Sequence, residues 1–193
     1  MTASDSSRPI LLVTGIPGAG KTSLAGRLAS GLSWPLLSLD SIKETLFTAA
    51  HSPVDSTAIG SGLLRRAAEQ VLWSTLEDVE GGAVVDIWVS PGRDDARVRA
   101  GLLNLNRPVL EVLCVVPPEL AARRYAGRVR SGPHRPPDLA VLASIRELAN
   151  LVEPLDVGHV RTVNTERPVD VRPLLDWVRL GRNAPPAEEV AED

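Results

Sequence analysis

A glycine-rich segment near the start of the chain carries the clearest chemical signal. Residues 15–22 read GIPGAGKT, which fits the pattern G-x-x-x-x-G-K-[ST], and they follow the apolar run ILLV at residues 10–13. The stretch KTSLAGRLASGL then repeats leucine at helical spacing, so the pattern predicts a strand, a loop and a helix in that order. Glycines let the backbone wrap a phosphate, and amide groups at a helix N-terminus attract an anion. The segment therefore predicts a loop that binds the phosphates of a nucleotide.

Each position of this loop has a predicted role in nucleotide binding. The candidate binding residues are Gly15, Pro17, Gly18, Ala19, Gly20, Lys21, Thr22 and Ser23. Lys21 would reach the β and γ phosphates, and the hydroxyl of Thr22 would bind Mg²⁺. Pro17 stiffens the loop, while residues 18–22 keep their amide donors. The predicted ligand is a nucleoside triphosphate, taken to be ATP, together with Mg²⁺.

Two aspartates follow apolar runs that predict strands. Asp40 comes directly after PLLSL at residues 35–39, and Asp86 ends AVVD at residues 83–86. Ligands bind at the carboxyl ends of parallel strands, so both side chains are expected at a site. Asp40 is the candidate base that takes a proton from an acceptor hydroxyl, and Asp86 is the candidate metal ligand. As alternatives, Asp40 caps the following SIKETLF turn, where Ser41 is also a candidate cap, and Asp86 has a structural role.

Residues 120–138 are rich in arginine. The arginines of this segment are Arg123, Arg124, Arg128, Arg130 and Arg135. Arg124 and Arg128 are four residues apart and would share one helix face. The GPHRPP break suits a lid over residues 123–137, from which Arg124 and Arg128 would act as catalytic residues on the transferred phosphoryl group, with Arg124 also binding the nucleotide. The alternative is a solvated basic helix.

Four further residues carry weaker signals. Thr165 follows the strand predicted at residues 160–164 and is a candidate contact to the nucleobase. Trp88 could form a wall of an acceptor pocket, although packing explains a tryptophan there equally well. Arg93 and Arg97 could hold an anionic acceptor, and a charged helix face is the alternative for both.

The elements that must position these residues alternate along the chain. Strands are predicted at 10–13, 35–39, 83–87, 109–116 and 160–164. Helices are predicted at 21–32, 41–47, 61–80, 93–105, 118–130, 139–152 and 170–180. Strict alternation predicts a doubly wound α/β fold, with a parallel sheet and helices on both faces. We expect one domain over residues 1–182 and a disordered tail over residues 183–193.

Composition excludes several classes of protein. The 193 residues are 44% hydrophobic and 23% charged, which is typical of a soluble globular protein, and no apolar run approaches the roughly 18 residues of a membrane helix. A single cysteine, Cys114, excludes an internal disulfide framework and a cysteine-based zinc site. The first residues lack the apolar core of a secretory signal, so a cytoplasmic location is expected. A net charge of −3 argues against a protein that coats nucleic acid.

Five segments together resemble a known group of enzymes. The segments are GIPGAGKTSLA, SLDSIKETLF, AVVDIW, RRYAGRVRSGPHRP and VNTERPVDVRPLLDWV. They are similar to the bacterial P-loop kinases of the AAA-type ATP-binding group, which is close to polynucleotide kinases, chloramphenicol phosphotransferase and zeta toxins. The resemblance covers residues 9–180 and implies a five-stranded parallel sheet in the order 2-3-1-4-5.

The resemblance also implies roles for individual residues. Asp40 would be the base, Thr22 and Asp86 would bind the metal, and Lys21 would bind phosphate. Arg124 and Arg128 would be lid arginines. Lys43, one of only two lysines in the chain, stands where these kinases often carry arginine, and a lysine cannot make the bidentate contact that arginine makes.

The leading functional hypothesis is an ATP-dependent kinase that acts on a hydroxyl of a small molecule. A regulatory ATPase that acts through a protein partner is one alternative, and a zeta-like toxin or a nucleic-acid end kinase is another. The chain has no N-K-x-D guanine signature, which disfavours a GTPase. The acidic pI of about 5.7 lowers the nucleic-acid option. The acceptor and the oligomeric state stay open.

Overall fold

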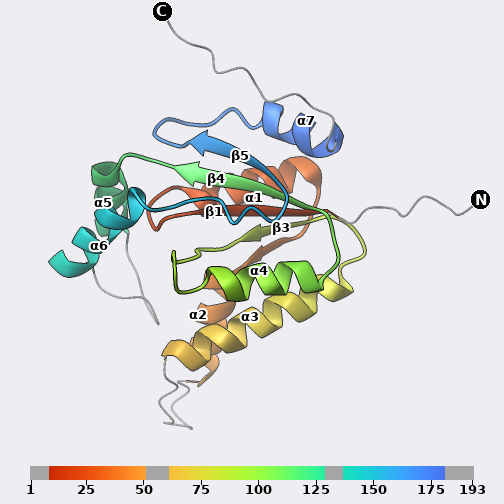
Figure 1. Ribbon diagram of the computed structural model, residues 1–193, viewed down its shortest axis with the longest axis horizontal. Coiled ribbons are helices and arrows are strands. Elements are labelled where there is room, and N and C mark those ends of the chain that lie inside the picture. The colour runs from red at the N-terminus through yellow and green to blue at the C-terminus, as the bar shows by residue number, and fades with distance from the viewer. Residues whose placement is uncertain (1–8, 51–60, 129–136, 181–193) are drawn as a thin grey trace, which may run out of the picture.

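The parallel sheet of this protein has five strands in the order β2-β3-β1-β4-β5 (Figure 1). The computed structural model describes residues 9–50, 61–128 and 137–180. The strands are β1 (Ile10–Gly15), β2 (Leu36–Ser38), β3 (Ala83–Asp86), β4 (Val109–Val115) and β5 (His159–Asn164). The helices are α1 (Lys21–Leu32), α2 (Leu39–Ala50), α3 (Ser61–Asp78), α4 (Asp95–Asn104), α5 (Pro118–Ala126), α6 (Leu139–Ala149) and α7 (Arg172–Leu180). The predicted fold class and strand order are confirmed.

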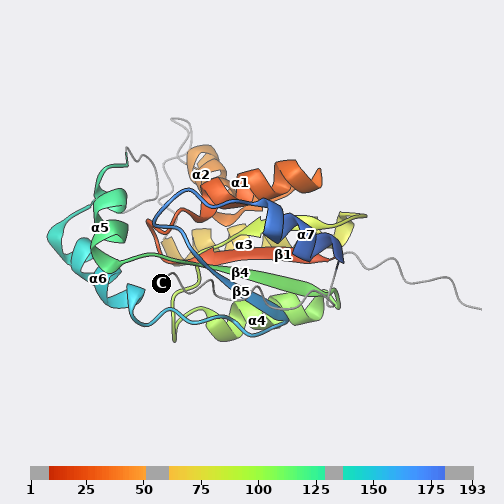
Figure 2. The same ribbon diagram turned by 90° about the horizontal axis from the view of Figure 1, so that it is seen from above.

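The register of the sheet brings the predicted site residues to one edge. Asp86 of β3 lies beside Val13 of β1 and beside Ser38 of β2. On the other side of β1, Gly15 pairs with Cys114 of β4. Because all strands are parallel, their carboxyl ends share this edge, and α5 and α6 lie beyond it in both views (Figures 1 and 2). The sheet therefore delivers residues distant in sequence to one place.

The core forms two layers, one on each face of the sheet. Alternate residues of β1 point to opposite faces: Leu11 and Val13 pack with α1 and α7, whereas Ile10 and Leu12 pack with α3 and α4. Every residue of β1 is buried. A strand covered on both faces has a continuous apolar sequence, which is why the run ILLV shows no polar alternation. No helix in the described ranges is long and apolar enough to cross a bilayer.

Some element boundaries differ from the predictions. Helix α2 begins at Leu39, so Asp40 lies in its first turn and not at the end of the preceding strand. Ser38 accepts a hydrogen bond from the backbone N–H of Ser41 at 3.5 Å, and therefore takes the capping position that was expected of Ser41. Helix α5 ends at Ala126, before the predicted end. The remaining lid residues 129–136 and the tail 183–193 lie outside the described residues.

A buried carboxylate fastens the segment between α6 and β5 to the sheet. Glu111 of β4 is fully buried and accepts hydrogen bonds from Thr14 Oγ1 at 2.8 Å and from the backbone N–H of Leu155 at 2.9 Å. Burial raises the pKa of the Glu111 carboxyl above its ordinary value, and these hydrogen bonds act in the opposite direction. Glu111 thus holds the segment that connects α6 to β5 in place.

We expect Glu111→Gln to change the pH dependence of stability. A raised pKa means that the folded protein disfavours the charged carboxylate, so the wild type loses stability relative to the variant as the pH rises above the unfolded value of about 4.5. Urea unfolding at several pH values between about pH 4 and pH 7 measures this difference.

Glu119 provides a control of opposite sign for this experiment. Its pKa is lowered by a hydrogen bond from Arg146, so the wild type should gain stability over Glu119→Gln as the pH rises. Equal slopes for the two variants would contradict the assignment of Glu111 as a carboxyl with a raised pKa.

Candidate active site

The glycine-rich loop between β1 and α1 is shaped by the elements packed against it. Gly15 and Gly18 have φ values of 132° and 90°, in the region that favours glycine. A Cβ atom on Gly15 would lie 2.4 Å from the carbonyl oxygen of Cys114, and one on Gly18 would lie 2.2 Å from that of Ala121. Only glycine therefore allows β4 and α5 to approach the loop so closely. The loop leads directly into α1, whose first amides have no partner within the helix and can bind an anion.

The side chain of Lys21 is buried beneath this loop. Its ammonium donates a hydrogen bond to the carbonyl oxygen of Ile16 at 3.1 Å. Burial lowers the pKa of Lys21 below its ordinary value, while the carboxylates of Asp86 and Asp40 act to raise it. Arg128 is near enough to act in the same direction as burial. Lys21 is thus a poorly solvated cation with two carboxylates and a second cation nearby.

The hydroxyl of Thr22 and the carboxylate of Asp86 meet at the start of α1. Thr22 Oγ1 donates to Asp86 Oδ2 at 2.7 Å, and Ser38 Oγ donates to the same oxygen at 3.3 Å. Hydroxyl and carboxylate oxygens suit Mg²⁺, so this donor set fits the predicted metal. Within the described ranges, no group of three or more histidine, cysteine or acidic side chains could hold a metal ion. A metal held by Thr22 and Asp86 would take its other ligands from phosphate and water.

Asp40 lies in the first turn of α2, two residues after Ser38. Its side chain is exposed, and it is close enough to Lys21 to act on the pKa of the ammonium. Lys43, one turn further along α2, is half-buried. The structure therefore brings Asp40 to the same edge of the sheet as Lys21, Thr22 and Asp86.

The two candidate lid arginines occupy different surroundings. Arg128 follows the end of α5, is exposed, and is near enough to Lys21 to act on the pKa of its ammonium. Arg124 donates from both terminal nitrogens to the carbonyl oxygen of Thr165 at 3.0 Å, and also to that of Glu166 at 3.0 Å. Thr165 itself is buried, and its hydroxyl donates to the carbonyl oxygen of Ala19 at 2.7 Å. Arg124 and Thr165 thus contact backbone groups around the loop, and their predicted contacts with nucleotide remain predictions.

An ion cluster that the sequence analysis did not identify joins α3 to α4. Glu69 and Asp94 are buried carboxylates, and they are paired with Arg65, Arg93 and Arg97. Arg97 donates to Glu69 Oε2 at 2.6 Å and to Asp94 Oδ1 at 3.0 Å. These pairs favour a structural role for Arg93 and Arg97 over the binding of an anionic acceptor. The i, i+4 spacing of Arg65 and Glu69 and the i, i+3 spacing of Asp94 and Arg97 are local signals of these pairs, but neither links α3 to α4.

The ion cluster also fixes the chain that follows Asp86. Arg65 Nη2 donates to the carbonyl oxygen of Trp88 at 3.0 Å, and the backbone N–H of Ser90 donates to Asp94 Oδ2 at 3.2 Å. The Trp88 ring is partly buried and packs against the core layer that contains the loop residue Ile16. Both the backbone and the side chain of Trp88 are therefore held in place beside the site.

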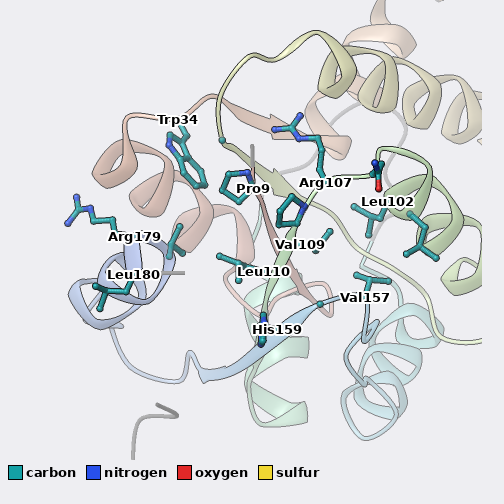
Figure 3. Close-up of a pocket in the computed structure, with 16 residues that line it drawn as sticks. Pro9, Trp34, Leu102, Arg107, Val109, Leu110, Val157, His159, Arg179 and Leu180 are labelled. Carbon is teal, nitrogen blue, oxygen red and sulfur yellow. The ribbon is translucent and has the colours of Figure 1, made fainter. Parts of the chain in front are cut away.

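The opposite edge of the sheet contains a separate cavity (Figure 3). It has a volume of about 1130 Å³, and it lies around the amino ends of the strands, where Pro9, Val109 and His159 line it. Arg107, at this edge, donates to the carbonyl oxygens of Leu76 and Gly81. None of the predicted site residues lines this cavity.

Comparison with known proteins identifies the family of this chain. Residues 10–152, more than half of the chain, match the family model AAA_33, which is described as an AAA domain. The protein belongs to the AAA_33 family. Among curated proteins, no match is found.

This AAA_33 protein shares its fold with solved structures of low sequence identity. A candidate kinase from Chloroflexus aurantiacus has a TM-score of 0.74 and 24% identity, and the match covers 90% of this chain and 98% of that chain. Shikimate kinase from Acinetobacter baumannii, in complex with shikimate, has a TM-score of 0.57 and 19% identity, with 90% and 92% covered. A gluconokinase from Sinorhizobium meliloti has a TM-score of 0.53 and 15% identity, with 89% and 88% covered. At these identities, the similarity establishes a common fold.

We expect the affinity for Mg·ATP to decrease at alkaline pH because of Lys21. In the protein without nucleotide, burial lowers the pKa of this ammonium below the ordinary lysine value of 10.5, and a triphosphate beside it would raise that pKa again. At pH values above the pKa of Lys21 in the protein without nucleotide, binding requires that Lys21 take up a proton, so the affinity falls as the pH rises. Calorimetry between about pH 8 and pH 10, in buffers of different ionisation enthalpy, measures both affinity and proton uptake.

A Lys21→Met variant is the control for this titration. Its residual affinity should be independent of pH over the same interval, since the titrating ammonium is gone. Wild-type affinity that is constant over this interval, without proton uptake, would contradict the prediction.

Proposed function

We propose that this protein is an ATP-dependent kinase that transfers the γ-phosphoryl group of Mg·ATP to a hydroxyl group of a small molecule. The proposal rests on the hydrogen bond between Thr22 and Asp86 beside the buried ammonium of Lys21. A hydroxyl, a carboxylate and a cation in this arrangement suit a metal-bound triphosphate.

The loop and the first turn of α1 would bind the phosphate chain. The backbone amides there provide donors, and Lys21 would exchange its hydrogen bond to the Ile16 carbonyl for a contact with phosphate oxygens. Phosphate would give the ammonium the anionic partner that burial makes favourable. Binding therefore relieves an unfavourable charge and orients the γ-phosphoryl group.

Thr22 and Asp86 would hold Mg²⁺ between the loop and β3. When bound, the metal would supply positive charge that neutralises charge on the transferred phosphoryl group. Ser38 donates to the Asp86 carboxylate and would keep it oriented toward Thr22. The parallel register of β2 and β3 is thus part of the proposed metal site.

Asp40 would act as the base for the acceptor hydroxyl. In the transfer step, the bond between the γ-phosphorus and the bridging oxygen breaks, and a bond forms between that phosphorus and the acceptor oxygen. The hydroxyl proton passes to the Asp40 carboxylate, and ADP is the leaving group. Arg128, which is exposed and near Lys21, would stabilise the negative charge on the phosphoryl oxygens during transfer.

The similar structures and the ion cluster both support a small acceptor. The similar structures include proteins named as a shikimate kinase and a gluconokinase, and the matches cover about nine tenths of this chain. In the ion cluster of α3 and α4, the arginines are paired with the carboxylates of Glu69 and Asp94. They therefore do not form the open basic surface that a nucleic acid requires.

Transfer of γ-labelled phosphate tests the proposed function directly. The protein is incubated with labelled Mg·ATP and a metabolite extract, and we expect a labelled small molecule that is absent with Lys21→Ala. Slow release of inorganic phosphate that no extract component stimulates would favour a regulatory ATPase instead. Labelled protein or nucleic acid, without any labelled small molecule, would also overturn the proposal.

We expect Asp40→Asn to separate nucleotide binding from phosphoryl transfer. The amide cannot accept the hydroxyl proton, so kcat should fall by about 100-fold or more. The Kd for Mg·ATP should stay within about twofold, because Asp40 is not predicted to contact the nucleotide. Titration calorimetry and the labelled-phosphate assay give the two values.

Asp95 offers a matched control for Asp40, since each is an acidic residue in the first turn of a helix. Asp95→Asn should leave both kcat and Kd close to the wild-type values. A kcat for Asp40→Asn within about threefold of the wild type would exclude Asp40 as the base.

A further inference from the structure

A buried hydrogen bond connects the glycine-rich loop to a segment 146 residues later in the chain. The hydroxyl of Thr165 donates to the carbonyl oxygen of Ala19 at 2.7 Å, and its second, longer acceptor is the carbonyl oxygen of Val115 on β4 at 3.1 Å. Ala19 lies within the loop, directly before Gly20 and Lys21. Thr165 lies just after β5 and belongs to none of the motifs that predict phosphate binding. Because the bond to Ala19 is the shorter of the two, the hydroxyl supports the loop and ties it to the end of β4.

The hydrogen bond to the Ala19 carbonyl also fixes the direction of the next backbone N–H, that of Gly20. In a trans peptide, the carbonyl of one residue and the N–H of the next point in opposite directions. The Thr165 hydroxyl holds the Ala19 carbonyl toward the end of β5, so the N–H of Gly20 points away from β5. The N–H of Ala19 donates to the carbonyl oxygen of Ile16 at 3.1 Å and is not available to a ligand. Gly20 is thus the amide that this peptide presents.

The backbone of Thr165 is itself held by β4 and by α5. Its backbone N–H donates to the carbonyl oxygen of Val115 at 2.9 Å, at the end of β4. Its carbonyl oxygen accepts from both terminal nitrogens of Arg124, on α5, at 3.0 Å. A shift of Thr165 would break these contacts together. The hydroxyl therefore transmits the positions of β4, β5 and α5 to the loop.

The geometry points to Thr165 as a positioning residue, whose hydroxyl fixes the Ala19–Gly20 peptide so that the Gly20 N–H meets the phosphate chain. This inference rests on the proposed binding of Mg·ATP at the loop. It replaces the nucleobase contact that the sequence suggested for the same residue, because the side chain is buried and its hydroxyl donates to the loop backbone.

The two roles make different predictions for nucleotide selectivity. A contact to the base would affect ATP and GTP unequally, since the two bases offer different donors and acceptors. An effect through the Gly20 amide acts on the phosphates, which ATP and GTP share. The ratio of the two affinities therefore distinguishes a positioning role from a base contact.

Two conservative variants of Thr165 provide the test. Thr165→Val keeps the shape and removes the hydroxyl, whereas Thr165→Ser keeps the hydroxyl. Titration calorimetry of ligand-free protein with Mg·ATP and Mg·GTP should show that Thr165→Val weakens both by about tenfold, which is the effect of losing one well-formed hydrogen bond. Thr165→Ser should stay within about twofold of the wild type for both nucleotides. Thr162→Val, at an exposed threonine of β5, should leave both affinities unchanged.

The same titrations give the outcomes that would overturn the inference. Wild-type affinity in Thr165→Val would exclude a positioning role, and a loss for only one nucleotide would restore the base contact. Equal losses in the valine and serine variants would show that the hydroxyl is not responsible. If wild-type protein binds neither nucleotide, the proposed function fails, which differs from all of these results.

Arg124→Lys provides a second test in case Thr165→Val does not fold. Lysine cannot reproduce the forked contact with the Thr165 carbonyl, so this variant should weaken Mg·ATP and Mg·GTP by the same factor. Unchanged affinities for both nucleotides would contradict the inference.

Discussion

The enclosed ammonium of Lys21 is the constraint around which this site is organised. A buried cation is unfavourable unless polar or charged partners surround it. In the protein alone, the Ile16 carbonyl and the nearby carboxylates of Asp86 and Asp40 provide that compensation, whereas Arg128 opposes it. An anion placed between the two cations would satisfy both. The site therefore favours a highly charged anion such as a triphosphate over a neutral ligand.

The position of the glycine-rich loop depends on elements that are distant in sequence. Carbonyl groups of Cys114 on β4 and Ala121 on α5 lie where side chains on Gly15 and Gly18 would be. Thr165, after β5, holds the loop carbonyl of Ala19. The glycines are thus required by the scaffold, and the proposed phosphate chain would require them as well. This double requirement explains why a short pattern predicts both a local structure and a place in a larger fold.

Sequence reasoning succeeded where a pattern has a local cause. Apolar runs and leucine spacing predicted the five strands and most helices, and the resemblance to P-loop kinases supplied the strand order. The start of α2 was predicted two residues too late because α2 follows β2 without a connecting loop, although Asp40 lies at the predicted edge of the sheet. Glu111 was missed because its partners, Thr14 and the backbone of Leu155, are distant in sequence. Pairing of Arg97 with Glu69 likewise depends on how two helices pack, which spacing along one chain does not encode.

The ion cluster of α3 and α4 fixes the chain beside the candidate active site. Burying Glu69 and Asp94 costs solvation free energy, and their arginine partners together with the backbone of Ser90 offset that cost. The same cluster fixes the chain that follows Asp86, because Arg65 donates a hydrogen bond to the carbonyl oxygen of Trp88. Phosphoryl transfer depends mainly on positioning and on fixed charges. In the proposed kinase, the fixed chain after Asp86 and a loop held from β4, β5 and α5 would supply such positioning before any substrate binds.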